Sequence, residues 1–189
     1  MTPQVFIAGY IGDHEGVLSM RPSDNGNWTG GHRGVGVLVG SKFGVTAGAL
    51  ATYRGVSPRT ITAADIANLD KVTAVDIGVK LYFLHPGFDK LPWNRVTASI
   101  VDKGWGSGTG RAIQLLQRLI GVTQDGVLGP NTITTYTQYL AAHGEEVAAQ
   151  NWAKVRIAFD ESLGQPEYIH GWNNRTNSFL PGTPWWKSW

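Results

Sequence analysis

Residues 2–16 read TPQVFIAGYIGDHEG, and the pattern within them indicates how the fold begins. Phe6, Tyr10 and His14 recur every fourth residue, which is the spacing of one face of an α-helix. A threonine and a proline suit the start of this helix, and a glycine suits its end. The stretch therefore predicts a helix over residues 2–15.

The next segment, residues 17–46, has a different pattern. Glycine recurs through its second half. Val35, Val37 and Val39 occupy every second position, which is the period of a β-strand. Glycines at this density favour turns. We expect a small, loop-rich β-hairpin insertion directly after the first helix.

Helical patterns return from about residue 62. Residues 62–65 and 73–76 both resemble capping boxes, in which Thr is followed three residues later by Asp. A glycine-rich loop is expected over residues 104–110, and a long helix over 145–163. The clearest amphipathic helix has its apolar side chains on one face, at Ala112, Leu115, Leu116, Leu119 and Ile120. These patterns predict a mainly α fold.

The composition excludes several classes of protein. Among the 189 residues there is no cysteine, which excludes a disulfide scaffold and a thiolate nucleophile. The net charge of +2 suits an anionic polymer, but no Lys/Arg cluster is dense enough to predict nucleic-acid binding. The five histidines show no metal-ligand spacing, so we expect no metal and no cofactor.

The N-terminal stretch does not resemble a signal peptide. It lacks a basic segment, and Gly9, Gly12 and Asp13 interrupt its apolar run. No stretch of the sequence is long and apolar enough to span a bilayer. We therefore expect neither a signal peptide nor stable membrane insertion.

Glu15 is the first candidate for catalysis. It falls in the last turn of the predicted first helix, where the partial negative charge of the helix end disfavours a carboxylate. We expect this position to raise its pKa, so that a protonated Glu15 can act as a general acid. The alternative is that Glu15 is an exposed residue at a helix end.

Asp24 is a candidate for the second carboxylate. It lies nine residues after Glu15, within the loop sequence RPSDNGNWT of residues 21–29. Inverting glycosidases use two carboxyl groups about 6.5–9.5 Å apart, and a loop after the first helix can fold back to that distance. The alternative is a turn residue, because Asp-Asn-Gly is typical of turns.

The order of these motifs resembles glycoside hydrolase family 108, a family of N-acetylmuramidases that includes many phage endolysins. The similarity lies in His14-Glu15-Gly16, Asp24, residues 26–31 and residues 40–46. This chain has Val and Leu at positions 17 and 18, where the family usually has Gly and an aromatic residue. It also has Ser, Phe and Thr at 41, 43 and 46, where Thr, Tyr and Ser are common. The resemblance implies a lysozyme-like α+β fold with Glu15 as the catalytic acid.

The spacing of Glu15 and Asp24 is also similar to that of phage lysozymes, in which Glu, Asp and a nearby Thr form the catalytic group. By this likeness either Thr29 or Ser41 holds the attacking water, and we favour Ser41 because the residues after it are typical of a strand. Four further residues of these motifs are candidates for substrate binding, namely His14, Trp28, Phe43 and Thr46.

The C-terminal half resembles the family's predicted peptidoglycan-binding region. The similar motifs are Asp102-Lys-Gly104, Leu115-Leu-Gln117, Asp125-Gly126 with Gly129-Pro130, and the terminal Gly171-Trp172-Asn-Asn-Arg175. We expect one domain over 1–189, with catalytic motifs in 1–90 and a helical binding lobe in 91–180. The alternative is that these motifs only pack and pair within the helical lobe.

Together the motifs predict a monomeric muramidase that hydrolyses the β-1,4 bond between N-acetylmuramic acid and N-acetylglucosamine in peptidoglycan. The resemblance and the N-terminus favour a phage endolysin that is made in the host cytoplasm and reaches the wall through a holin. Two alternatives are a lytic transglycosylase and a non-catalytic wall-binding or secretion-accessory protein. The host, the wall chemotype and the identity of the base are open.

Overall fold

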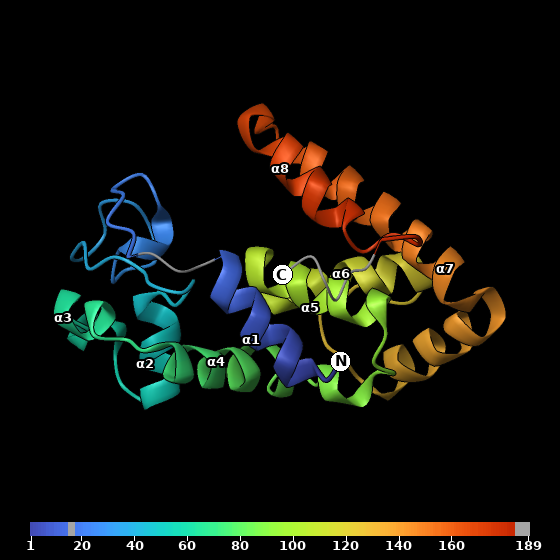
Figure 1. The fold of residues 1–189 in the computed structure, drawn as a ribbon, viewed down its shortest axis with the longest axis horizontal. Helices are drawn as coiled ribbons and strands as arrows, with labels where there is room; N and C mark the ends of the chain where they lie inside the picture. Colours follow the sequence, from blue (N-terminus) through green and yellow to red (C-terminus); the bar gives the residue numbers. More distant parts are fainter. Residues whose placement is uncertain (15–17, 184–189) are drawn as a thin grey trace. The chain divides into compact units, whose positions relative to one another are not determined.

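The computed structural model describes the backbone of residues 1–14 and 18–183, and the side chains of residues 1–9 and 18–183 (Figure 1). Glu15 therefore lies outside the described residues, as does the side chain of His14. The α-helices are α1 (Pro3–His14), α2 (Ala47–Arg54), α3 (Ala63–Ala67), α4 (Lys71–Val79), α5 (Arg95–Ser107), α6 (Thr109–Ile120), α7 (Pro130–Ser162) and α8 (Pro166–Asn177). Shorter helical turns are η1 (Asn25–Asn27), η2 (Pro58–Thr60), η3 (Lys80–Leu84) and η4 (Phe88–Lys90).

The mainly helical fold predicted from the sequence is confirmed. Within the described ranges, the Gly-rich segment after α1 holds isolated β-bridges and no continuous strand. The bridges join Ser19 to Ser41, Trp28 to Leu38 and Lys42 to Val45. The first helix is also confirmed, because α1 covers nearly the whole predicted stretch.

The described residues form two compact units, which divide after Leu81, so that the second unit begins at Tyr82 and is described as far as residue 183. In the first unit, α1 and α2 both pack against α4. Its largest fully buried apolar side chains on the described helices are Phe6 on α1, Leu50 on α2, Ile66 on α3 and Ile77 on α4. Burying one such side chain contributes roughly 1.5–3 kcal/mol, so these four residues supply much of the stability of the scaffold that carries the Gly-rich segment.

The second unit is a group of packed helices in which α5 and α6 both contact α7, and α7 contacts α8. The amphipathic face predicted for α6 is confirmed, since Ala112, Leu115 and Leu116 are buried there. A glycine with φ of 75° at position 144 interrupts α7. The helix expected over 145–163 is therefore the second part of a longer element.

Two local predictions were wrong. The second capping box does not form, because the side chain of Asp70 caps α4 by accepting a hydrogen bond from the Thr73 amide at 2.6 Å. The loop expected over 104–110 is helical instead. Only Gly108, with φ of 85°, separates α5 from α6, because the neighbouring glycines remain in helical conformation.

Candidate active site

The loop that carries Asp24 is packed closely against the start of α2. The Asp24 carboxylate caps η1, since Oδ1 accepts a hydrogen bond from the Gly26 amide at 2.9 Å. A Cβ at position 26 would lie 2.8 Å from the methyl group of Thr46, so this approach requires glycine. Thr46 in turn caps α2 through a hydrogen bond from the Ala49 amide. The start of the helix thus fixes the position of the aspartate loop.

Asn27 holds the Gly-rich segment together from inside. Its side chain is fully buried, and Nδ2 donates to the Ser19 hydroxyl at 3.2 Å and to the Arg21 carbonyl at 3.0 Å. Its own carbonyl accepts hydrogen bonds from the amides of Val39 and Gly40. Sequence reasoning missed this role, because Asn-Gly-Asn is equally typical of an exposed turn.

Ser41 is placed by backbone pairing and by a tight turn. Its amide and carbonyl both bond to Ser19, at 3.0 and 2.8 Å. Two residues later the chain reverses at Phe43 and Gly44, whose φ angles are 53° and 71°. Positive φ at both central residues is the pattern of a type I′ hairpin turn. The turn holds Ser41 at its base.

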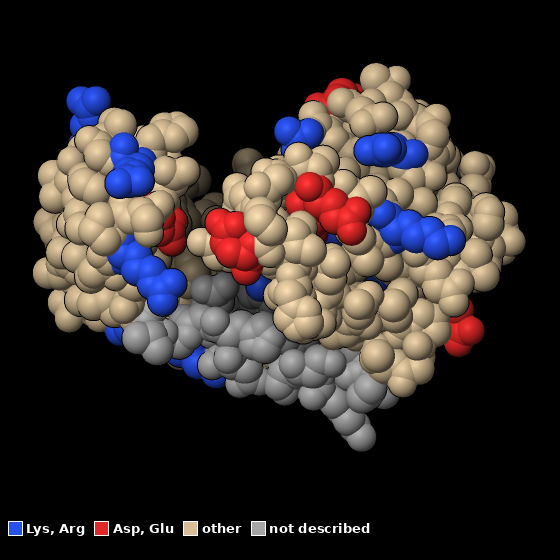
Figure 2. All heavy atoms as spheres, turned by 90° about the horizontal axis from the view of Figure 1, so that it is seen from above, with Lys and Arg blue, Asp and Glu red and all other residues tan. Residues whose placement is uncertain are grey.

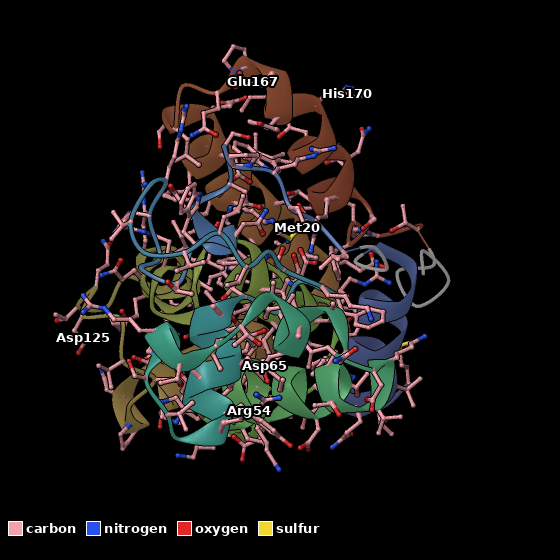
Figure 3. All side chains as sticks on the ribbon, turned by 90° about the vertical axis from the view of Figure 1, so that its left-hand side faces the viewer. Met20, Arg54, Asp65, Asp125, Glu167 and His170 are labelled. Atoms are coloured by element: carbon pink, nitrogen blue, oxygen red, sulfur yellow. The ribbon has the colours of Figure 1, made fainter. Side chains whose placement is uncertain are left out.

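Lys42 anchors this turn to the helical scaffold. Its ammonium group donates to the carbonyls of Ala67 and Leu69, at 2.7 and 2.8 Å, around the end of α3. The start of α3 is tied to α2, because Arg54 and Asp65 form an ion pair at 2.6 Å (Figure 3). The Arg54 guanidinium and the Thr62 hydrogen bonds hold the pKa of the Asp65 carboxyl well below its usual range.

Asp24 and Ser41 line the same open hollow of about 410 Å³. Ligand pockets in proteins commonly have volumes of about 300–1,000 Å³, so a hollow of this size can hold a small molecule or part of a polymer. The hollow is also lined by Leu18, Ser19, Met20, Arg21 and Gly44. Of these, Arg21 adds a cationic residue to the lining, which its sequence context did not indicate.

Thr29 lies away from this hollow. It is only 5% exposed, and its hydroxyl accepts a hydrogen bond from the Val37 amide at 2.9 Å. Its surroundings are crowded, since a Cβ on Gly36 would lie 2.2 Å from the Thr29 hydroxyl oxygen. Of the two hydroxyls considered from the sequence, only that of Ser41 therefore shares a surface with Asp24.

The predicted substrate-binding residues are held by local contacts. Trp28 is half-buried, and its indole N–H donates to the Pro22 carbonyl at 3.0 Å. Phe43 is also half-buried, and the Lys42 ammonium lies 5.2 Å from its ring centroid. Thr46 is the cap of α2 and packs on the aspartate loop, as described above. Substrate binding by these residues, and by His14, stays a prediction.

The surface of the Gly-rich segment is mildly basic. Its basic residues are Arg21, Arg33 and Lys42, whereas Asp24 is its one acidic residue between positions 18 and 46. Figure 2 shows Lys and Arg atoms at the surface over this segment, at the left of the view. Such an excess of positive charge attracts an anionic polymer.

The described residues include neither a metal-binding cluster nor a membrane-spanning helix. No group of three His, Asp or Glu side chains among them is placed to hold a metal ion. None of the helices in the described part of the chain is both long and apolar enough to cross a membrane. The hollow lined by Asp24 and Ser41 is the candidate active site of the first unit.

A family model described as glycosyl hydrolase 108 matches residues 8–108, which is more than half of the chain. The chain belongs to glycosyl hydrolase family 108. It is accordingly a glycoside hydrolase of the N-acetylmuramidase type, and its family acts on peptidoglycan. The matched range includes Asp24, Ser41 and every other residue that lines the hollow.

One solved structure with a similar fold is described as the structure of Brucella abortus SagA. The TM-score is 0.66 and the two chains are 23% identical, and the match covers 92% of each chain. At this identity the similarity supports the fold of the family 108 enzyme and not its substrate. A search among functionally curated proteins finds no match.

Proposed function

We propose that this family 108 enzyme hydrolyses the β-1,4 bond between N-acetylmuramic acid and N-acetylglucosamine in peptidoglycan. The observation that supports this proposal is the hollow lined by Asp24 and Ser41, which lies within the family-matched range. Its basic surroundings suit an anionic wall polymer. The hollow is open to solvent, as a polymeric substrate requires.

In this proposal Glu15 is the general acid. It gives its proton to the oxygen that leaves with N-acetylglucosamine. Glu15 precedes Leu18 by three residues, and Leu18 lines the hollow. Consecutive Cα atoms are 3.8 Å apart, so the Cα atoms of these two residues are separated by at most about 11 Å. That reach allows the carboxyl group to meet a sugar bound beside Asp24.

Asp24 and Ser41 act on the water molecule. One oxygen of the Asp24 carboxylate is used to cap η1, and within the described residues the other accepts no hydrogen bond. That second oxygen takes the proton of a water held by the Ser41 hydroxyl, while the water oxygen bonds to the muramoyl anomeric carbon. The glycosidic bond breaks as Glu15 protonates the leaving oxygen, so the configuration inverts.

The test is lysis of purified peptidoglycan by matched variants. Glu15→Gln removes the acidic proton without changing the size of the side chain, and we expect it to abolish lysis while the circular dichroism spectrum is retained. The control is Glu146→Gln, because Glu146 is exposed on α7. Full activity of Glu15→Gln would reject Glu15 as the acid.

Asp24→Asn tests the second role. Asparagine keeps the side-chain oxygen that caps η1, so this substitution separates catalysis from capping. We expect the rate to fall by about 10²–10⁴-fold, as is typical for loss of a general base. Asp89→Asn, at an exposed position in η4, is the control. A rate unchanged in Asp24→Asn would make Asp24 only a turn residue.

The biological role proposed for the enzyme is that of a phage endolysin, supported by the family resemblance of its motifs. In this role a monomer is made in the host cytoplasm and reaches the wall after a holin opens the membrane. We expect expressed enzyme to lyse cells only when a holin is co-expressed, and light scattering to give the mass of one chain. Rapid lysis without a holin, or a stable dimer, would contradict this role.

A further inference from the structure

One charged side chain of the candidate active site has no partner among the described residues. Arg21 lines the hollow that also carries Asp24 and Ser41. Its backbone is fixed, because its carbonyl accepts hydrogen bonds from the Asn27 side chain at 3.0 Å and from the Asp24 amide at 3.2 Å. Its side chain is exposed, and the guanidinium makes no hydrogen bond or ion pair with any residue of the described ranges. The backbone thus holds Arg21 at the hollow, and its charge remains available to a ligand.

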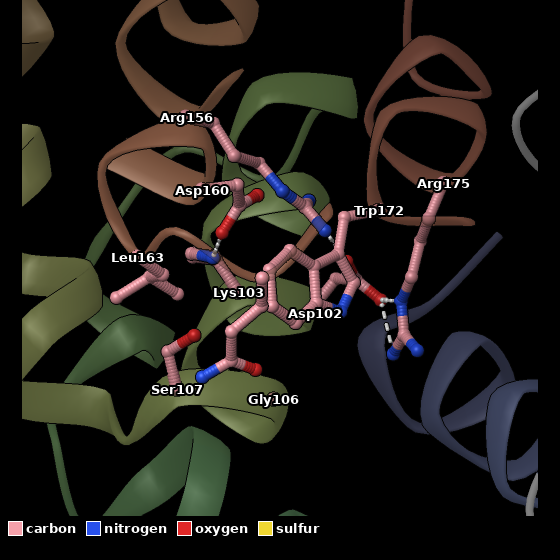
Figure 4. A pocket seen from close by; sticks show the side chains of 10 residues that line it. Asp102, Lys103, Gly106, Ser107, Arg156, Asp160, Leu163, Trp172 and Arg175 are labelled. Atoms are coloured by element: carbon pink, nitrogen blue, oxygen red, sulfur yellow. Dashed lines mark hydrogen bonds and ion pairs between the residues drawn. The ribbon is translucent and has the colours of Figure 1, made fainter. Parts of the chain in front are cut away.

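A hollow in the helical unit, among α5, α7 and α8, has charged side chains that pair with one another (Figure 4). Lys103 pairs with Asp160, and Arg156 pairs with Asp102 at 2.5 Å. The terminal motif meets the same cluster, because the Arg175 guanidinium donates to Asp102 at 2.9 Å. These ion pairs compensate charges within the helical unit, so this hollow does not need a charged ligand. Arg21 differs from them in having no such pair.

Leu18 and Met20 add an apolar surface to the hollow that Arg21 lines. Ser19, between them, is in an extended segment paired with Ser41, and its hydroxyl accepts a hydrogen bond from the buried Asn27 side chain. Because side chains alternate along an extended segment, Leu18 and Met20 lie on the face opposite to this hydroxyl. Both side chains lie over Gly40, since a Cβ built there would be 2.4 Å from the Met20 sulfur and 3.5 Å from a Leu18 methyl carbon. They are 39% and 41% exposed, so part of each can contact a ligand.

The charge of Arg21 also decides which ligands the hollow can accept. Arg21 and Asp24 are the charged residues of its described lining. The Asp24 carboxylate repels an anionic group bound nearby, whereas the guanidinium attracts it. The planar fork of an arginine binds a carboxylate through two parallel hydrogen bonds. Arg21 therefore allows the hollow to accept a carboxylate despite Asp24, and the apolar pair favours a ligand that carries methyl groups beside that carboxylate.

We propose that residues 18–21 recognise the muramoyl residue of the substrate through its lactyl substituent, which N-acetylglucosamine lacks. The lactyl group carries a methyl group and a carboxyl group, and in the intact wall this carboxyl group is joined to the stem peptide. Arg21 binds a carboxylate on this substituent, either that of the lactyl group or that of the stem peptide, while Leu18 and Met20 contact its methyl groups. This inference rests on the proposed function, in which water attacks the muramoyl anomeric carbon beside Asp24.

The test compares the binding of three soluble ligands to the full chain by calorimetric titration. The variant Glu15→Gln is used, so that the ligands stay intact. The ligands are a peptide-free tetrasaccharide of alternating N-acetylglucosamine and N-acetylmuramic acid, the same tetrasaccharide with stem peptides, and chitotetraose, which has the same linkage and no lactyl group. A hydrogen-bonded carboxylate should make at least one muramoyl ligand bind about tenfold more tightly than chitotetraose.

Arg21→Gln, made in the same background, tests the cation. We expect it to weaken muramoyl binding about tenfold and to leave chitotetraose binding within twofold, so that the neutral ligand also reports an intact fold. Arg21→Lys keeps the charge and should retain part of the preference. Arg59→Gln is the matched control, because Arg59 is exposed on η2 and does not line the hollow. A larger effect on the peptide-free ligand would identify the lactyl carboxylate, and a larger effect on the other would identify the stem peptide.

Met20→Gln tests the apolar pair, because it replaces the thioether with a polar amide of similar length. We expect weaker binding of the muramoyl ligands and unchanged binding of chitotetraose. Val56→Thr is the control, since Val56 is similarly exposed, at 45%, and lies outside the lining.

Equal affinity for chitotetraose and both muramoyl ligands, or a preference that persists in Arg21→Gln, would overturn the role of residues 18–21. The proposed reaction is tested separately, because titration does not require hydrolysis. A wild-type enzyme that releases muropeptides, with no muramoyl preference in Glu15→Gln, rejects the recognition by residues 18–21 alone. A muramoyl preference in a protein that does not cut peptidoglycan rejects only the proposed muramidase reaction.

Discussion

Replacing Gly40 with alanine should disturb the candidate active site through the backbone alone. Gly40 has a φ of 84°, a conformation that costs an L-residue about 1–2 kcal/mol. The added Cβ would lie 2.6 Å from the Ser19 carbonyl oxygen and 2.4 Å from the Met20 sulfur. The methionine can move, but the carbonyl belongs to the pairing that places Ser41.

The size of the effect follows from these contacts. The two hydrogen bonds between Ser19 and Ser41 contribute about 1 kcal/mol each, and the clash must weaken at least one. Adding the conformational cost, we expect Gly40→Ala to lower the free energy of unfolding by about 2–4 kcal/mol. Because Ser41 shifts with the backbone, the rate of wall lysis should fall as well.

Gly34→Ala is the matched control for this experiment. Gly34 has a φ of 76°, but a Cβ there meets no atom within 4 Å. It should therefore show the conformational cost of about 1–2 kcal/mol without the clash. Urea unfolding followed by tryptophan fluorescence measures both variants, and clearing of a wall suspension measures their activity. Equal stability and equal activity of Gly40→Ala and Gly34→Ala would refute the reasoning from close approach.

Three further predictions concern the charged groups. Asp160→Ala leaves Lys103 buried without its carboxylate, and urea unfolding should show a loss of about 3–5 kcal/mol in the free energy of unfolding. Because burial lowers the folded-state pKa of Lys103, the stability of this variant relative to wild type should recover as pH rises toward 10. A loss that is constant with pH would contradict this. The pKa of Asp65 is lowered beside Arg54, so the stabilisation that its carboxylate gives the fold is present above pH 4 and is lost as pH falls below it. In thermal melts, the melting temperature of Asp65→Asn should therefore fall less steeply with acid than that of wild type. An identical fall would exclude the Asp65 carboxylate as a source of the acid sensitivity. Lys42→Met removes two hydrogen bonds to carbonyls around the end of α3. It should lower the free energy of unfolding by about 1–3 kcal/mol and slow wall lysis. An unchanged rate of lysis would show that the turn at Phe43 and Gly44 keeps its place without this anchor.

The helices were predictable where periodicity and caps agreed. The apolar face around Leu115 and the capping box at Thr62 both form as the sequence indicates. The loop expected over 104–110 failed because glycine permits a loop but does not require one. In the structure α5 and α6 bury their apolar faces on each other and on α7, and this packing outweighs the low helix propensity of glycine.

The candidate site was predictable only in part. Asp24 and Ser41 were identified from spacing and resemblance, and the structure places both on one hollow. The burial of Asn27 and the anchoring by Lys42 depend on contacts between distant parts of the chain, which a single sequence does not show. The same limit applies to the ion pair between Arg156 and Asp102, whose partners are 54 residues apart.

The most direct test of the muramidase assignment is mass spectrometry of the soluble products from purified peptidoglycan. We expect muropeptides that end in reducing N-acetylmuramic acid, produced by wild-type enzyme and absent with Glu15→Gln. Products with 1,6-anhydro ends would instead show a lytic transglycosylase. Reducing N-acetylglucosamine ends, or wall binding without soluble products, would contradict the assignment altogether.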